Sequence, residues 1–319
     1  MQNKLSGLLK KNYSQYVVYV SFFLILIFFS ITLSPAVFLS PLQLMNILRQ
    51  TAMVSIMAVG MTFALTAGEI DLSIGSLVAL SALVTGVVLN RFDSIPLALF
   101  AGLGTGVTVG FVNGLITTKA RIPAFLVTLG TASILGGLAR SITNLESVPI
   151  INKSFNYIFG SGNVGIVSTL FIWTILIACA GHLLLKNTPF GRAVLATGGN
   201  RSAAKYSGIR TDRIRIAVLT ISALSASFAG VLYAGRLHGA RYTLGGSDLM
   251  TVIAAVIIGG TSFSGGMGSV VGAIIGSLVM GMMNSGLLLM GLNVSQQMIA
   301  RGIIIIVAVS LSLREKSES

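Results

Sequence analysis

Two carboxylates, Glu69 and Asp71, stand two positions apart in a chain that is otherwise mostly apolar. They belong to the segment GEIDLSIGS at residues 68–76, where one long apolar run ends and another begins. A carboxylate in apolar surroundings is costly, so this pair could form a proton or cation site. The alternative is that Asp71 or Ser73 caps the helix that starts here. Because both acids flank a break between runs, capping is favoured.

A second break, GGTSFSGGMG at residues 259–268, is rich in glycines and hydroxyl groups. Glycine permits tight turns, and hydroxyl groups can bind the backbone groups that a broken helix leaves free. Both breaks lie between apolar runs, which suggests an internal duplication. The positions that we single out in the two breaks are Gly68, Asp71, Ser73, Gly75, Gly259, Gly260, Thr261, Gly265 and Gly266.

The sequence predicts no enzyme, no metal site and no cofactor bound by this chain. His182 and His238 are isolated, without the spacing of metal ligands. No lysine follows a glycine, which excludes the Gly-Lys-Ser/Thr segment of a P-loop. No nucleophile is paired with a base, so no catalytic residue is assigned. If the activity of this chain uses ATP, another chain must bind the ATP and Mg²⁺.

The apolar runs on either side of these residues predict membrane-spanning helices. The chain is 54% hydrophobic and only 9% charged, which is too little charge to cover a water-soluble protein. A span needs about 20 mostly apolar residues. We predict an all-α, polytopic membrane protein with about ten spans, of which the third and eighth are short. The predicted spans are 16–33, 44–67, 74–89, 95–117, 124–139, 164–185, 214–235, 249–260, 270–290 and 299–313.

The distribution of basic residues predicts the orientation of these spans. The net charge is +13. Ten spans place both termini on one side, and the segments on that side carry twice as many Lys and Arg residues as the segments on the other. Basic loops face the cytoplasm, so both termini are predicted to be cytoplasmic. The positive charge of this chain is therefore explained by contact with the anionic headgroups of membrane lipid. No basic stretch alternates with aromatic residues, which argues against a nucleic-acid partner.

One cytoplasmic connection, residues 186–213, is long and basic. Pro189 and Gly191 predict a turn. Asn200 is a good N-cap for a short helix over 201–206, and a glycine soon afterwards would end this helix. Such a helix could dock a cytoplasmic partner, and an ordinary basic loop is the alternative. The positions that we single out here are Gly191, Arg192, Gly198, Gly199, Asn200, Ala203, Ala204, Ser207 and Gly208.

Four segments in a fixed order carry a resemblance to a known family. They are GEIDLSIGS, KARIPAFLVTLGT (119–131), GRAVLATGGNRSAAKYSGI (191–209) and GGTSFSGGMG. Together they resemble the permease subunits of the ribose/simple-sugar branch of ATP-binding-cassette importers. Two departures leave the substrate open. Glu69 stands where the family usually has a small residue, and Asp248 stands where a Glu–Leu–Asp-like group is expected.

The resemblance implies one permease domain over residues 1–319, in a bacterial inner (cytoplasmic) membrane, that imports a monosaccharide or a similar small polar solute. It also implies three partners: a two-cassette ATPase, a periplasmic or lipid-anchored substrate-binding protein, and a second permease copy or a similar sister permease. An ion-coupled secondary transporter that uses Glu69 or Asp71 is the alternative. An intramembrane enzyme would need clustered catalytic groups, which the sequence lacks.

Passage of a sugar requires hydrogen-bonding groups and some aromatic surface that bind it weakly. For each candidate position the alternative is packing or hydrogen bonding between helices. The residues that we expect to line the path are Asn113, Phe125, Thr128, Thr131 and Asn284.

Overall fold

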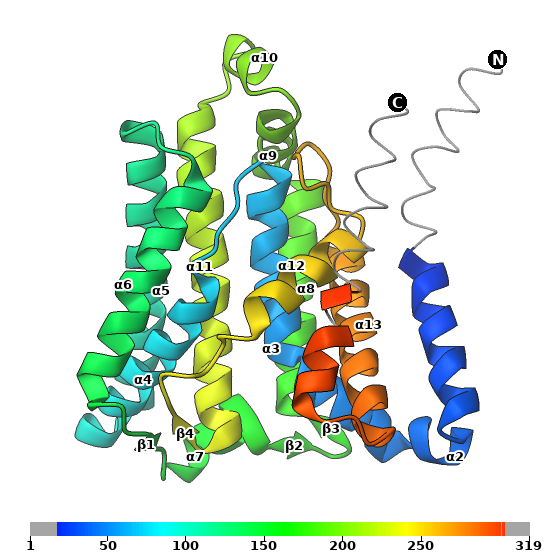
Figure 1. The fold of residues 1–319 in the computed structure, drawn as a ribbon. Helices are drawn as coiled ribbons and strands as arrows, with labels where there is room; N and C mark the ends of the chain where they lie inside the picture. Colours follow the sequence, from blue (N-terminus) through cyan, green and yellow to red (C-terminus); the bar gives the residue numbers. More distant parts are fainter. Residues whose placement is uncertain (1–17, 301, 304–319) are drawn as a thin grey trace, which may run out of the picture.

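The computed structural model describes residues 18–300 and 302–303 of the chain, and most of them are helical (Figure 1). The long helices run side by side between two ends of a bundle. Two short helices, α9 (Pro189–Gly199) and α10 (Arg201–Tyr206), lie at one end, which we call the α10 end. We call the opposite end the β4 end, after β4 (Gly239–Ala240).

Seven helices among the described residues are long and apolar enough to cross a membrane. Two further apolar helices are shorter, namely Val18–Thr32 and α12 (Asp248–Ile258). The chain is therefore a mostly helical, polytopic membrane protein. The seven long helices are α3 (Pro41–Thr66), α4 (Ile74–Phe92), α5 (Ile95–Lys119), α6 (Ala124–Thr143), α8 (Thr169–Asn187), α11 (Thr211–Leu237) and α13 (Val270–Leu289).

Short elements connect the helices at the β4 end. Strand β4 pairs antiparallel with β1 (Val148–Pro149), and β2 (Asn163–Val164) pairs antiparallel with β3 (Val167–Ser168). These pairings, with further hydrogen bonds such as that from the N–H of Ile150 to the carbonyl oxygen of His238, satisfy the backbone of the loops at this end. The remaining short elements are α2 (Pro35–Phe38), α7 (Lys153–Asn156) and the π-helix η1 (Tyr157–Ser161).

Most of the predicted spans coincide with one of these helices, and one is wrong at its start. The run over 164–185 begins with residues that form the β2–β3 hairpin around Gly165, so α8 starts only at Thr169. Apolar residues in this hairpin extended the run without belonging to a helix. The run over 299–313 lies almost entirely outside the described residues, as do both termini.

Helix α3 lies at the centre of the bundle. Every residue from Thr51 to Thr66 is buried, and α8, α11, α12 and α13 pack around this helix. A helix that is apolar on all sides is expected in this position, since none of its faces meets lipid or water. The surrounding helices α5, α6 and α8 are far less buried and present apolar side chains outward.

Small residues allow α5 to approach α11 closely. Gly106, Gly110 and Gly114 recur at four-residue intervals on α5 and are buried against α11. A Cβ added to Gly110 would lie 2.6 Å from the Cα of Thr220. Helices in membranes associate through such close backbone contacts, because lipid supplies no hydrophobic drive between them.

We expect Gly110→Leu to destabilise the fold, because the new side chain has no space between α5 and α11. Overpacking of this kind costs about 1–3 kcal/mol of unfolding free energy. Gly104→Leu is the matched control, since no heavy atom lies within 4 Å of a Cβ at Gly104 of the same helix. Thermal unfolding in detergent should show a clear loss for Gly110→Leu and little change for Gly104→Leu. Equal losses would contradict the close α5–α11 contact.

Candidate functional site

The glycine-containing segments of the sequence meet at the α10 end. The N–H of Gly266 donates to the carbonyl oxygen of Thr66 at 2.9 Å. A Cβ on Gly198 would overlap that same oxygen, and a Cβ on Gly265 would lie 3.1 Å from the Cα of Gly68. We call these five residues the glycine joint. The glycine joint holds the ends of α3 and α9 against the turn before α13 by backbone contacts, with no room for side chains.

The rest of the 259–268 segment forms a tight turn between α12 and α13. Gly260 has a positive φ of 82°, a backbone conformation that glycine adopts without strain. A Cβ on Gly259 would lie 2.5 Å from the carbonyl carbon and oxygen of Gly272 on α13. The hydroxyl of Thr261 accepts a hydrogen bond from the N–H of Ser269 at 3.3 Å. The turn therefore satisfies part of its backbone internally, as the glycine and hydroxyl composition predicts.

The carboxylate of Glu69 is shared by two arginines from different elements. Oε1 of Glu69 accepts from Nη2 of Arg201 at 2.6 Å, and the same atom pairs with Nε of Arg215. Glu69 and Arg215 are both buried, whereas the side chain of Arg201 is 47% exposed. Arg201 is the first residue of α10 and Arg215 lies on α11. The ion pair therefore ties the segment after α3 both to α10 and to the bundle.

Asp71 lies at one end of a chain of hydrogen bonds between helices. Its Oδ1 accepts from the backbone N–H of Ser73 at 3.0 Å and from the hydroxyl of Ser73 at 2.6 Å. The amide of Asn113 on α5 donates to the Ser73 hydroxyl, and Thr131 on α6 donates to Asn113 at 2.7 Å. Thr128 on α6 accepts from the N–H of Leu72 at 3.0 Å. Residues 67–73 are thus fixed to α5 and α6.

These contacts correct the predicted roles of the acids. Ser73 precedes α4 but its side chain makes no capping hydrogen bond, so capping by Ser73 is wrong. Asp71 accepts the backbone N–H of Ser73, the residue before α4, and not one from the first turn of the helix, so Asp71 does not cap α4 either. Glu69 does not cap a helix. Its partners stand 132 and 146 positions further along the chain, which spacing within one motif cannot reveal. A buried acid beside a basic loop was the only signal for Arg201 and Arg215.

The 186–213 connection contains one more helix than predicted. Pro189 does not form a turn with Gly191: both belong to α9, and the hydroxyl of Thr188 accepts from the N–H of Gly191 at 3.1 Å as the N-cap. Proline is favoured in the first turn of a helix, because its missing N–H has no partner there. The pair Thr188–Pro189 was therefore the signal for α9. Gly198 and Gly199 form the last turn of this helix.

Helix α10 is confirmed within its predicted bounds. The side chain of Asn200 accepts from the N–H of Ala203 at 3.0 Å, and Gly208 follows the helix with a positive φ of 85°. Ala204 is buried, so it anchors α10 to the bundle. Most of the other predicted positions are exposed, namely Arg192, Gly199, Asn200, Ala203, Ser207 and Gly208. Tyr206, which was not predicted, is 92% exposed. Aromatic residues are enriched in protein–protein interfaces, so Tyr206 suits a contact surface at this tip.

The residues predicted to line a path do not form one group. Asn113, Thr128 and Thr131 hydrogen-bond between helices, which was the alternative for each. Phe125 is half exposed and lines a cavity of about 570 Å³ at the α10 end, together with Glu69, Arg121 and Arg201. Asn284 lines a second, separate cavity of about 250 Å³. Within the described part of the chain, no group of His, Cys, Asp or Glu could hold a metal ion.

Comparison with known proteins assigns this arrangement to a family. Residues 43–309 match the family model described as branched-chain amino acid transport system / permease component. The match covers most of the chain, including the glycine joint and α10. The chain belongs to this family of transport-system permease components.

Several curated relatives of this permease carry the names of sugar transport systems. The ribose import permease protein of Bacillus subtilis (strain 168) is 40% identical over 94% of this chain and 92% of its own length. The ribose import permease protein of Escherichia coli (strain K12) is 38% identical over 90% of both chains. The D-allose transport system permease protein of the same organism is 34% identical over 92% and 90%, respectively. No solved structure matches the chain.

Membership of this family confirms that the chain is a transport permease and not an enzyme. The matches to ribose import permeases extend over the segments on which the sequence resemblance was based. The chain is the membrane-spanning component of an importer of the ATP-binding-cassette type.

We expect Glu69→Gln to destabilise this permease, because it leaves the buried Arg215 without a carboxylate. Removing one partner of a buried ion pair costs about 3–5 kcal/mol. Arg201→Gln should cost much less, since water screens the half-exposed Arg201. Asp212→Asn, at an exposed position of the same end, is the control.

Thermal unfolding in detergent measures these differences. The double variant Glu69→Gln/Arg215→Gln should be more stable than the sum of the two single losses predicts, because it leaves no buried charge without a partner and only the half-exposed Arg201 unpaired. Strictly additive losses would show that the ion pair does not couple the two residues.

Proposed function

We propose that this permease translocates a monosaccharide, or a similar small polar solute, into the cytoplasm, driven by a separate ATPase. The observation that carries the proposal is 38–40% identity to two ribose import permeases over at least nine tenths of the chain. Relatives named for L-arabinose and D-allose are 34% identical over similar shares of the chain. Ribose, arabinose and allose are therefore the first substrates to test.

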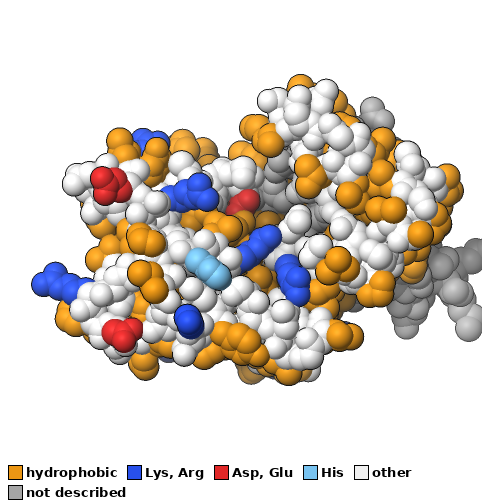
Figure 2. Space-filling model, turned by 90° about the horizontal axis from the view of Figure 1, so that it is seen from below, with side chains coloured by type: hydrophobic (Ala, Val, Ile, Leu, Met, Phe, Trp, Pro, Cys, Tyr) orange, Lys and Arg blue, Asp and Glu red, His pale blue; other side chains and the backbone are white. Residues whose placement is uncertain are grey.

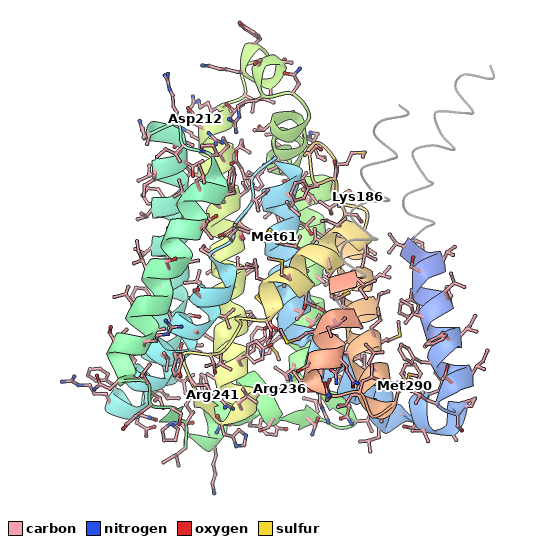
Figure 3. The ribbon with its side chains drawn as sticks, in the orientation of Figure 1. Met61, Lys186, Asp212, Arg236, Arg241 and Met290 are labelled. Carbon is pink, nitrogen blue, oxygen red and sulfur yellow. The ribbon has the colours of Figure 1, made fainter. Side chains whose placement is uncertain are left out.

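We propose ten spans, with residues 1–319 forming one permease domain. The seven long helices, Val18–Thr32, α12 and the helical segment that begins at residue 294 together support this count. The basic loops support placing both termini and the α10 end in the cytoplasm. In Figure 3 Asp212 and Lys186 mark the α10 end, and Arg236, Arg241 and Met290 mark the opposite one. The proposed location is a bacterial inner (cytoplasmic) membrane.

Helices α9 and α10 are proposed as the docking element for a two-cassette ATPase, which would bind the ATP and Mg²⁺. The tip of α10 presents Ala203 and Tyr206 to the cytoplasm, where a soluble partner can reach them. Behind this tip, the glycine joint and the ion pair of Glu69 connect α9 and α10 to the segment 67–73. Movement of a docked ATPase would thus reach the middle of the bundle through short, tightly packed contacts.

The remaining partners follow from the import direction. A periplasmic or lipid-anchored substrate-binding protein would deliver the solute at the β4 end. Figure 2 views this end and shows basic side chains gathered over the middle of the face. A second copy of the chain, or a similar sister permease, would complete the path through the membrane. The exposed apolar faces of α5, α6 and α8 are available for this partner and for lipid.

The contacts of the two acids do not support an ion-coupled secondary transporter. In such a mechanism Glu69 or Asp71 would face a site that contains water, and its carboxylate would bind and release a proton or another cation. Glu69 does line the cavity at the α10 end, but two arginines neutralise its carboxylate there, and Asp71 accepts hydrogen bonds from Ser73.

A reconstituted importer tests the proposal. The permease, a two-cassette ATPase and a loaded binding protein are placed in liposomes with ATP, and uptake of labelled D-ribose, L-arabinose and D-allose is measured. ATP-dependent uptake of one of these sugars that persists after a proton uncoupler is added is the expected result. Uptake that stops with the uncoupler while ATP is maintained would overturn the proposal in favour of ion coupling.

We expect Ala203→Arg to abolish association with the ATPase while leaving the fold intact. Ala203 is exposed on α10, so the added charge disturbs a partner surface and not the core. Ser154→Arg, at an exposed position of α7 near the β4 end, introduces the same charge away from the proposed docking surface. Co-purification should be lost for Ala203→Arg alone. Retention of the ATPase by both variants would place the docking surface elsewhere.

A further inference from the structure

The cavity of about 250 Å³ lies between α3, α11, α12 and α13. We call it the Asp248 cavity. Its polar lining includes Gln50, Tyr233, Arg236, Asp248, Thr251 and Asn284. Arg236 lies near the β4 end, opposite the proposed ATPase (Figure 3). The cavity is therefore on the side from which an imported solute arrives, and the other large cavity, lined by Glu69, is at the opposite end.

The start of α12 follows irregular backbone beside this cavity. Helix α12 has only 11 residues and begins at Asp248, after a non-helical stretch over 241–247 that is partly exposed. Irregular backbone within a membrane protein is tolerated only where protein buries it or where it lines a wet cavity. Gly245 fixes this start against α4, since a Cβ at Gly245 would lie 2.6 Å from the carbonyl oxygen of Gly75. Broken helices of this kind border the solute sites of many transporters.

The polar groups of the cavity suit a neutral solute with several hydroxyl groups. The hydroxyl of Tyr233 donates to Oδ2 of Asp248 at 2.6 Å, which fixes the orientation of this carboxylate. The lining carries one positive charge, on Arg236, and one negative charge, on Asp248, so both hydrogen-bond donors and acceptors are available to a neutral solute. The Oδ1 atom of Asn284 is buried and has no hydrogen-bond partner among the described residues. A buried acceptor without a partner is costly, and a solute hydroxyl would satisfy it.

We propose that the Asp248 cavity is a transient binding site for a monosaccharide on its way through the permease. Asp248 and Arg236 bind neighbouring hydroxyl groups, and Asn284 accepts a further hydroxyl. The cavity is smaller than the roughly 300–1,000 Å³ of pockets for drug-sized ligands, in keeping with a single sugar ring. This inference rests on the proposed function, because it assumes that the cargo is a sugar.

Cysteine labelling tests whether the cavity is wet and whether sugar occupies it. In a Cys179→Ala background, Asn284→Cys supplies the only thiol of the chain. A small, membrane-impermeant thiol reagent is added from the outside to the complete importer, with and without binding protein loaded with the transported sugar. We expect labelling that the loaded binding protein slows severalfold. Labelling that is absent, or that sugar does not slow, would overturn the proposal.

Transport measurements test the role of the polar groups. Asn284→Leu keeps the size of the side chain but removes its acceptor, and Asp248→Asn keeps the hydrogen bond from Tyr233 but removes the charge. Each should raise the KM for uptake about tenfold, the effect of losing one strong hydrogen bond. Ser285→Ala is the matched control, because Ser285 lies on the same helix and binds Gln43 outside the cavity.

Analogues of the transported sugar that lack one hydroxyl group show whether Asn284 contacts the sugar directly or whether its substitution only disturbs the structure. The wild-type importer should discriminate against the analogue that lacks the hydroxyl bound by Asn284, and Asn284→Leu should lose this discrimination. Unchanged KM and unchanged discrimination in both cavity variants would overturn the inference while the proposed function stands. No ATP-dependent sugar uptake by the wild type would overturn both. Binding protein alone, assayed with the same analogues, shows how much discrimination arises before the permease.

Discussion

The structure depends on one constraint: each backbone N–H and C=O inside the membrane must find a partner within the protein. The helices meet this constraint by themselves, but residues 67–73 and 259–268 do not. The segment 67–73 is held by side chains from α5 and α6, including Thr128, which accepts from the N–H of Leu72. The turn over 259–268 is held by its own hydroxyls and by the carbonyl of Thr66. The breaks are therefore possible only where several helices converge, and this convergence creates the candidate site.

The fold was largely predictable because lipid requires long apolar runs. The runs over 44–67 and 95–117 correspond to α3 and α5, and the cap residue Asn200 predicted α10 correctly. The prediction from local composition was wrong where apolar residues belong to a hairpin and not to a helix, as in the segment just before Thr169. Helix α9 was missed because proline and glycine indicate turns as often as helix starts. In this segment the helix begins because the hydroxyl of Thr188 accepts from the N–H of Gly191 as an N-cap.

The site was less predictable, since its contacts join residues far apart in sequence. Glycine content singled out Gly68, Gly198 and Gly266, but nothing in their spacing showed that they meet. The partners of Glu69 were likewise missed, although a buried, ionised carboxylate is commonly paired with a cation. These long-range contacts are the informative ones, because they link α9 and α10, the proposed docking element, to the segment 67–73 within the bundle.

The glycine joint and the Glu69 ion pair hold α9 and α10, respectively, against the bundle. The first does so through backbone contacts and the second through opposite charges. Dissolved ions screen attraction between charges, most effectively where one partner is as exposed as Arg201. The glycine joint consists of backbone atoms in contact and carries no net charge to screen. The packing contact between α9 and the bundle is therefore independent of ionic strength. With the α10 end in the cytoplasm, as proposed, a rise in the ion concentration there would weaken the ion pair of Arg201 with Glu69 but leave the glycine joint in place.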